Sequence, residues 1–109
     1  MKIVDSLTSE VINEGDKLKY TYRLIKSTYN NGQAYGIEVE REDLKGGKII
    51  NIERDNIKLI SNNKCKVRDL LNLLYKNQVS PIHLIEILGE YVDKYIEDFN
   101  NEENEMVIN

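Results

Sequence analysis

Three carboxylates stand at alternate positions in one short segment: Glu38, Glu40 and Glu42. In a β-strand alternate residues share a face and lie about 6.7 Å apart. Divalent cations bind oxygen ligands, so such a face is a candidate metal site. The spacing is too wide for one ion to be held by this strand alone, and Lys19 and Arg23 on the preceding predicted strand supply counter-charges. We therefore expect a solvated, ion-paired face, with a small metal- or ligand-binding protein as an alternative.

The chain has one cysteine, Cys65, and one histidine, His83. Cys65 lies between Lys64 and Lys66, an arrangement that can activate a thiol as a nucleophile. No second cysteine or histidine is present to form a relay, a disulfide or a multi-cysteine zinc site. The glycines of 45–48 precede a strand, whereas a phosphate-binding loop precedes a helix. We expect a partly buried thiol, a surface histidine, no cofactor and no enzymatic activity.

The aromatic set is uneven, with seven tyrosines, one phenylalanine and no tryptophan. Tyrosine is common at protein interfaces, because its ring is apolar and its hydroxyl stays hydrated. Tyr91 and Tyr95 border the second predicted helix, where packing at the edge of the core is the alternative role. Ile87 falls on the polar side of that helix, and Ile25 on the polar side of the sheet. These four residues are the candidate partner-binding residues.

Charge is divided unequally along the 109 residues. Fifteen basic and nineteen acidic side chains give a net charge of −4, of which residues 1–78 hold +3 and residues 79–109 hold −7. An acidic chain is repelled by phosphate backbones, so nucleic acid is not expected as a partner. No apolar stretch approaches the ~20 residues of a membrane span, and residues 1–6 meet charge too early for a signal peptide. We expect a cytoplasmic chain whose partner is another protein or a second copy.

Alternation of apolar and polar residues predicts strands in the first half of the chain. Leu18–Leu24 and Tyr35–Val39 each turn one apolar face inward, and Asn31-Gly32 between them is a strong hairpin signal. With those two residues as the loop, the opposed pairs are Leu24 with Val39, Arg23 with Glu40, and Ile25 with Glu38.

Two further strands are predicted on either side of this hairpin. The first covers about residues 2–12. The last follows Gly46-Gly47, with Ile50 and Ile52 inward, after which the apolar parity changes to Ile57 and Leu59. Because a one-residue slip exposes a whole face, the change predicts a bulge at Asp55-Asn56.

Helical periodicity begins after the capping residues 61–63 and ends near Lys76. Ser80-Pro81 then predicts the start of a second helix. Its apolar stripe contains Leu84, Ile85, Leu88, Val92, Tyr95, Ile96 and Phe99. Gly89 lies at the margin of the stripe, where another backbone can approach.

Together these elements predict an α+β fold. It consists of an antiparallel β-meander of three to four strands, with two C-terminal antiparallel helices packed on one face. Residues 1–99 form a single domain, and residues 100–109 form an acidic tail that we expect to be disordered.

Three segments, Tyr20–Ile25, Tyr35–Glu40 and Val79–Leu88, resemble short uncharacterised clostridial proteins. These are grouped as domain-of-unknown-function family number 6514. The likeness covers about residues 18–96, and it implies a cytosolic bacterial protein without assigning an activity. From the residues we favour a non-enzymatic protein-protein interaction or regulatory module. A metal or ligand binder using the Glu38, Glu40 and Glu42 face, or a homodimeric structural protein, is the alternative.

Overall fold

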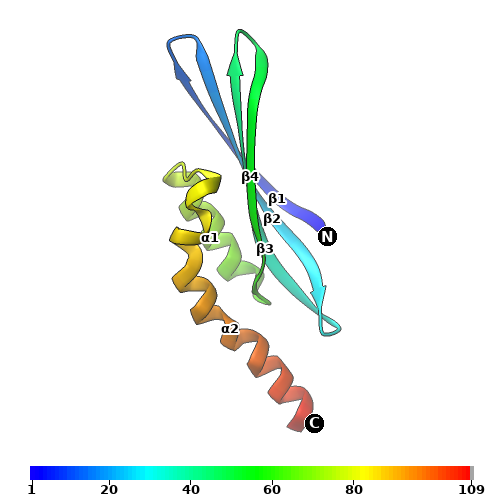
Figure 1. Ribbon diagram of the computed structural model, residues 1–109. Coiled ribbons are helices and arrows are strands. Elements are labelled where there is room, and N and C mark those ends of the chain that lie inside the picture. The colour runs from blue at the N-terminus through cyan, green and yellow to red at the C-terminus, as the bar shows by residue number, and fades with distance from the viewer. Residues whose placement is uncertain (109) are drawn as a thin grey trace.

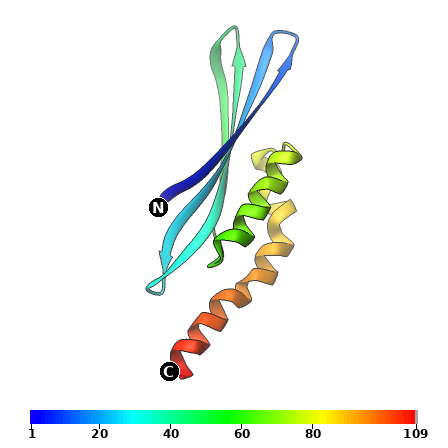
Figure 2. The same ribbon diagram turned by 180° about the vertical axis from the view of Figure 1, so that it is seen from behind.

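The computed structural model describes the backbone of residues 1–108 and the side chains of residues 1–12 and 14–99. Four strands pair as an antiparallel meander in the order β1-β2-β3-β4, and the helices pack on one face of the sheet (Figures 1 and 2). The elements are β1 (Lys2–Asn13), β2 (Asp16–Tyr29), β3 (Gly32–Lys45), β4 (Lys48–Ser61), α1 (Lys64–Lys76), the 3-10 turn η1 (Pro81–His83) and α2 (Leu84–Ile108). The predicted α+β meander is confirmed.

The prediction for the C-terminal tail falls mostly outside the described residues. Helix α2 continues past residue 99 and ends at Ile108. The side chains of residues 100–109 are outside the described part, so a disordered acidic tail stays a prediction.

The central hairpin turns one residue earlier than the sequence predicted, which shifts the cross-strand pairs by two residues. Asn30 and Asn31 both have positive φ, 49° and 64°, and form the loop, while Gly32 pairs with Tyr29 in the sheet. Asparagine tolerates the left-handed region, so two asparagines can make the turn that Asn-Gly was expected to make. Leu24 therefore opposes Ile37 and not Val39. A shift of two residues leaves the predicted inward face unchanged.

That inward face forms the core of the molecule. Tyr20, Tyr22, Leu24, Ile37 and Val39 are buried against the apolar sides of both helices. The hydroxyl of Tyr22 donates a hydrogen bond of 3.0 Å to the carbonyl of Val79, in the link between α1 and η1. Burial raises the pKa of this phenol. The bond leaves the buried hydroxyl satisfied and ties the link to the sheet.

Strand β4 departs from its predicted pattern. Its register with β3 is continuous through Asp55 and Asn56, so the predicted bulge there is wrong. The irregularities lie near Ile50 and between Ile57 and Ser61. Ile50 and Ile52 are exposed, and Ile52 pairs with Glu42 on the outer face, so its predicted inward position is wrong. The inner positions at this end are Glu53 and Asp55, where the sheet extends beyond the helices. The change from apolar residues at even positions to apolar residues at odd positions therefore marks the place where the core ends.

Both helices begin close to the predicted residues. The side chain of Asn63 caps α1 by accepting hydrogen bonds from the backbone N–H groups of Cys65 and Lys66. Pro81 opens the second helical segment as a 3-10 turn that leads into α2. Within the predicted stripe, Leu84, Leu88 and Phe99 are buried, whereas Ile85 and Ile96 are exposed. The stripe is therefore wider than the sheet that it covers.

The molecule is elongated, with extents of 60 × 23 × 18 Å, because the strands are longer than the helices can cover. The two hairpins at the β1–β2 and β3–β4 turns project past the helices (Figure 1). In that projecting part the inner face is charged. Arg41 binds Asp43 at 2.9 Å and Glu53 at 3.4 Å. Ion pairs thus replace apolar packing where no helix covers the sheet.

The sheet bends where irregularities on two strands meet at one level. Ile25 pairs with Ile3 next to the β1 irregularity, and with Gly36 next to the β4 irregularity. Carbonyl oxygens of Ile57 and Lys58 pass so close to Gly36 that a Cβ there would lie 2.1 and 2.4 Å from them. Only glycine admits this crossing of β4 over β3.

We predict that Gly36→Ala lowers the free energy of unfolding by about 3 kcal/mol, because backbone atoms cannot move aside as a side chain does. Gly89→Ala is the matched control. A Cβ at Gly89 would meet nothing within 4 Å, so the expected close approach of another backbone at Gly89 is wrong. Alanine in a helix is favoured over glycine by up to about 1 kcal/mol, so this variant should be slightly more stable. Urea unfolding checks both values, and equal effects would contradict the description of Gly36.

Candidate functional site

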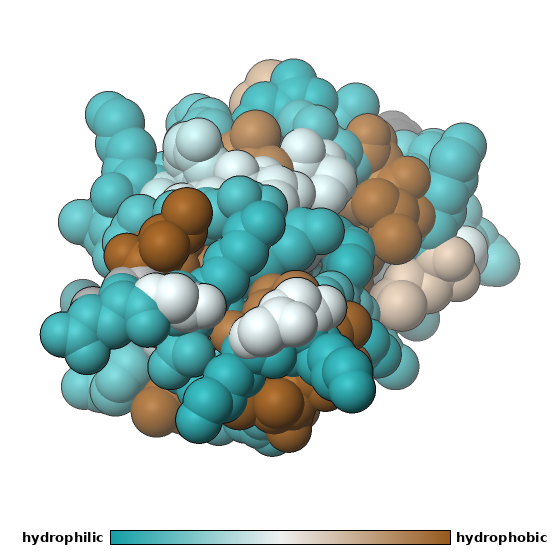
Figure 3. All heavy atoms as spheres, turned by 90° about the horizontal axis from the view of Figure 1, so that it is seen from above, coloured by the Kyte–Doolittle hydropathy of each residue, from teal (hydrophilic) through white to brown (hydrophobic). Residues whose placement is uncertain are grey.

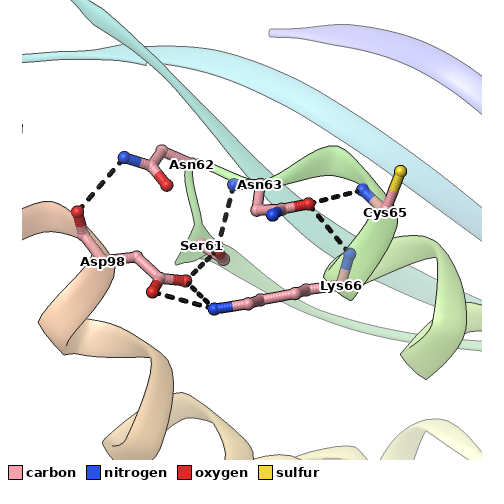
Figure 4. Close-up of polar contacts among 6 residues, drawn as sticks. All are labelled: Ser61, Asn62, Asn63, Cys65, Lys66 and Asp98. Carbon is pink, nitrogen blue, oxygen red and sulfur yellow. Dashed lines mark hydrogen bonds and ion pairs between the residues drawn. The ribbon is translucent and has the colours of Figure 1, made fainter.

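A polar cluster centred on Asp98 fixes α2 to the end of β4 and to the start of α1 (Figure 4). The hydroxyl of Ser61 donates to Asp98 Oδ2 at 2.5 Å, and Lys66 Nζ donates to both carboxylate oxygens at 2.9 and 3.0 Å. The side chain of Asn62 donates to the backbone carbonyl of Asp98 at 3.2 Å. We call Ser61, Asn62, Lys66 and Asp98 the Asp98 cluster.

The Asp98 cluster holds an ionised carboxylate at a partly buried position. Burial opposes ionisation, but the hydrogen bond from Ser61 and the charge of Lys66 outweigh it, so the pKa of Asp98 is lowered. Ser61 is fully buried, and its oxygen also accepts the backbone N–H of Asn63 at 3.0 Å. Lys66 further lies 5.0 Å from the centre of the Tyr95 ring. These contacts fix the rotation of α2 about its own axis.

With α2 held this way, one side of the helix faces α1 and the other faces the β4 edge of the sheet. Two isoleucines on the second side are exposed, Ile85 by 61% and Ile96 by 55%, and Ile82 of η1, just before the helix, is exposed by 69%. Val92 lies between Ile85 and Ile96 at helical spacing, and Leu59 of β4 is exposed beside them. We call Ile82, Ile85, Val92, Ile96 and Leu59 the β4-side flank.

The β4-side flank contains a small apolar pocket. Its volume is about 150 Å³, and its lining comes from α2, the end of β4 and the end of β2. The lining residues are Tyr29, Leu59, Ile60, Val92, Ile96 and Phe99. A second hollow, lined by Glu53, Arg54, Asp55, Pro81 and Ile82, lies between β4 and η1. An apolar pocket and a polar hollow thus lie at two separate levels of β4.

Hydrophobic side chains are also exposed elsewhere on the surface. Seen from above, hydrophobic side chains form separate patches among hydrophilic ones (Figure 3). Ile49, Ile50 and Ile52 are exposed on the projecting β3–β4 hairpin, away from the helices. What distinguishes the β4-side flank is that one exposed isoleucine, Ile96, lines an apolar pocket and another, Ile82, lines the hollow beside η1.

The structure separates the four partner-binding residues predicted from the sequence. Ile25 is only 1% exposed, so its predicted surface position is wrong. It lies at the bend of the sheet, between the two irregular strands, and not on a flat solvated face. Ile87 is 37% exposed. Tyr91 and Tyr95 are partly buried against the core and lie 6.2 Å apart.

The predicted carboxylate face is an ion-pair ladder across three strands. Arg23 contacts Glu38 at 2.9 Å and Glu40 at 2.7 Å, and Arg54 contacts Glu40 at 3.0 Å. Glu40 is only 5% exposed; burial opposes its ionisation, but Arg54 and Arg23 outweigh this and lower its pKa. Glu42 lies farther along the strand, opposite Lys19. Among the described residues no group of three or more His, Cys, Asp or Glu is placed to hold a metal ion.

The single cysteine and the single histidine lie apart from this ladder. Cys65 is exposed, which corrects the expected partial burial, and its sulfur points away from Asp98 (Figure 4). The neighbouring Lys66 directs its ammonium group to Asp98. His83 is an exposed residue of η1, and its Nδ1 lies 3.2 Å from Glu86. The structure brings neither residue to the other.

Sequence reasoning placed Ile85 and Ile96 in the buried stripe and so missed their exposure. The sequence did carry a signal of this exposure, because the apolar arc of the second helix is wider than the part that one packing contact can bury. Which margin stays uncovered depends on the rotation of the helix, and the Asp98 cluster sets that rotation through residues distant in the sequence.

Comparison with known families assigns the chain to a group. Residues 1–94 match the model of a family of unknown function, DUF6514, and the chain belongs to this family. The match includes the first strand, which the resemblance read from the sequence had left out. No curated protein and no solved structure matches the chain significantly. Within the described residues no helix is both long and apolar enough to cross a membrane.

We predict that Asp98→Asn lowers the free energy of unfolding at neutral pH by about 2 kcal/mol, since it removes charge-assisted hydrogen bonds. The folded pKa of Asp98 lies below its unfolded value of about 3.9. The contribution of Asp98 to the free energy of unfolding is therefore present above that pH and is lost as the pH falls through the folded pKa. Denaturation at several pH values should show the difference between the two proteins narrowing below about pH 4. A difference independent of pH would contradict this role.

Proposed function

We propose that this member of DUF6514 is a non-enzymatic protein-protein interaction or regulatory module, acting, as its sequence indicates, in the bacterial cytoplasm. The observation that carries the proposal is the β4-side flank, where the exposed Ile96 lines an apolar pocket and the exposed Ile82 lines the hollow beside η1. The exposed Ile85 lies on the same side of α2 as Ile96. Grouped apolar side chains of this kind on a small protein mark contact surfaces more often than single exposed ones do. A helix side beside a free strand edge is a common form of such a surface.

Two alternatives are favoured less by the contacts. A metal site on the Glu38, Glu40 and Glu42 face competes with Arg23 and Arg54, which already neutralise two of the carboxylates. A homodimer through α2 would use the same apolar flank. It would also bring together two copies of a segment that carries −7 over residues 79–109, which disfavours the pairing.

The test is purification of the tagged chain at its natural level from the organism that encodes it, followed by native mass spectrometry. We expect another protein at fixed stoichiometry, and its loss from the double variant Ile85→Asp/Ile96→Asp. Both positions are solvent-exposed, so the unfolding temperature of the variant should stay within about 2 °C of the parent. A chain recovered alone, or with only a metal or small molecule bound, would contradict the proposal.

A further inference from the structure

Three features along one edge of the molecule indicate the chemistry of the partner that it binds. They are the apolar pocket under Ile96, the free edge of β4, and a row of carboxylates on α2. We propose that this edge binds an extended, basic segment of another protein, which pairs with β4 and places one large apolar side chain in the pocket. This inference rests on the proposed interaction function and names the chemistry of the partner.

The size and chemistry of the pocket determine which side chain the partner inserts. Its volume of about 150 Å³ is that of a cavity able to take up a benzene-sized group. All six lining residues are apolar or aromatic, and Ile96 and Leu59 at its rim are exposed. A phenylalanine ring or a leucine side chain matches this size and chemistry. Interface energy concentrates in such anchors when they fill a pocket and exclude water.

The edge of β4 sets the backbone conformation of the partner. β4 is the last strand of the meander, so alternate residues direct their N–H and C=O groups away from the sheet. Its register is regular from Asn51 to Ile57, between the two irregularities. A regular edge of this length accepts an added strand through main-chain hydrogen bonds, while pockets beside it select side chains.

The row of carboxylates on α2 determines the charge of the partner. Glu86, Glu90, Asp93 and Glu97 recur at helical spacing on the exposed side of α2, next to Ile82 and the rest of the β4-side flank. Within the described residues, Glu90, Asp93 and Glu97 have no ion pair; His83 contacts Glu86. Lys94 is the only basic residue of the 79–109 segment. A row of like charges, three of them without an ion pair among the described residues, steers oppositely charged partners and repels a second acidic helix.

The polar hollow beside η1 adds to the same selection. Glu53, Asp55 and Arg54 line it, and the guanidinium of Arg54 is already paired with Glu38 and Glu40. Glu53 Oε2 is shielded from solvent and accepts no hydrogen bond from any described residue. A lysine or arginine at that end of an added strand would supply the missing donor. The partner is therefore basic at the η1 end and apolar at the pocket end.

A displayed library of random peptides of about ten residues, the length of an ordinary strand, tests this inference on the full chain. We expect the selected peptides to be enriched in lysine and arginine and to share one large apolar residue. Their affinity should fall at least about tenfold for Ile96→Asp, and should be unchanged for Ile87→Asp, the matched control on the α1 side of the same helix. N-methylation of alternate backbone nitrogens in a selected peptide should also abolish binding.

Further variants separate the contributions. Changing Glu86, Glu90 and Glu97 to glutamine and Asp93 to asparagine should weaken binding about tenfold at low salt and remove most of its salt dependence. Since Ile96 lines the pocket, Ile85→Asp serves as a second flank variant if Ile96→Asp does not fold. The positions of both residues on the exposed flank make lost packing small.

Each other outcome overturns the inference in a distinguishable way. Acidic or purely apolar peptides, binding sensitive to Ile87→Asp in place of Ile96→Asp, or no enriched peptide would each contradict the basic strand partner. If a natural partner is still retained by the Ile85→Asp/Ile96→Asp variant, the interaction function stands and this surface is wrong. A concentration-dependent dimer in sedimentation that Ile96→Asp dissociates would assign the flank to a second copy.

Discussion

The ion pair between Asp98 and Lys66, with the hydroxyl of Ser61 as third member, determines how α2 lies on the sheet. Its three residues come from α2, α1 and the last residue of β4, so one carboxylate joins three elements. The core alone does not fix the rotation of α2, because apolar residues cover about half of its circumference. With Asp98 turned toward α1, Leu84 and Leu88 face the core and Ile85 and Ile96 face outward beside β4. The exposed flank is therefore a consequence of a polar contact.

The sheet is subject to a second constraint, which is length. Strands of up to fourteen residues extend past the helices, and the inner face changes there from apolar to charged residues. The outer face is held by arginines that each contact two carboxylates. In this ladder Arg23 and Arg54 neutralise Glu38 and Glu40, two of the three glutamates on that strand face. The pocket between β4 and α2 has no such charged lining, and the side chains of Leu59 and Ile96 that line it are exposed.

The fold was largely predictable from local patterns. Alternation found the strands, Asn63 and Pro81 marked the helix starts, and Tyr22, Leu24, Ile37 and Val39 were placed on the correct face. The hairpin register was not predictable in this way, because Asn30-Asn31 and Asn31-Gly32 can both form the turn. Pairing with the rest of the sheet decides between them. The site was predicted less well. Ile25 was assigned to solvent because a bend produced by irregularities on β1 and β4 leaves no signal in its own strand.

The central claim is that the β4-side flank is open to solvent in the free chain. Isoleucine methyl groups report this directly, through their line broadening by a small soluble nitroxide in solution NMR. The account predicts strong broadening for Ile82, Ile85 and Ile96, as for the exposed Ile50, and little for the buried Ile25 and Ile60. If Ile85 and Ile96 are as protected as Ile25 at every protein concentration, the flank is covered within the chain and the account is wrong. Protection that appears only as the concentration rises would assign the flank to self-association instead.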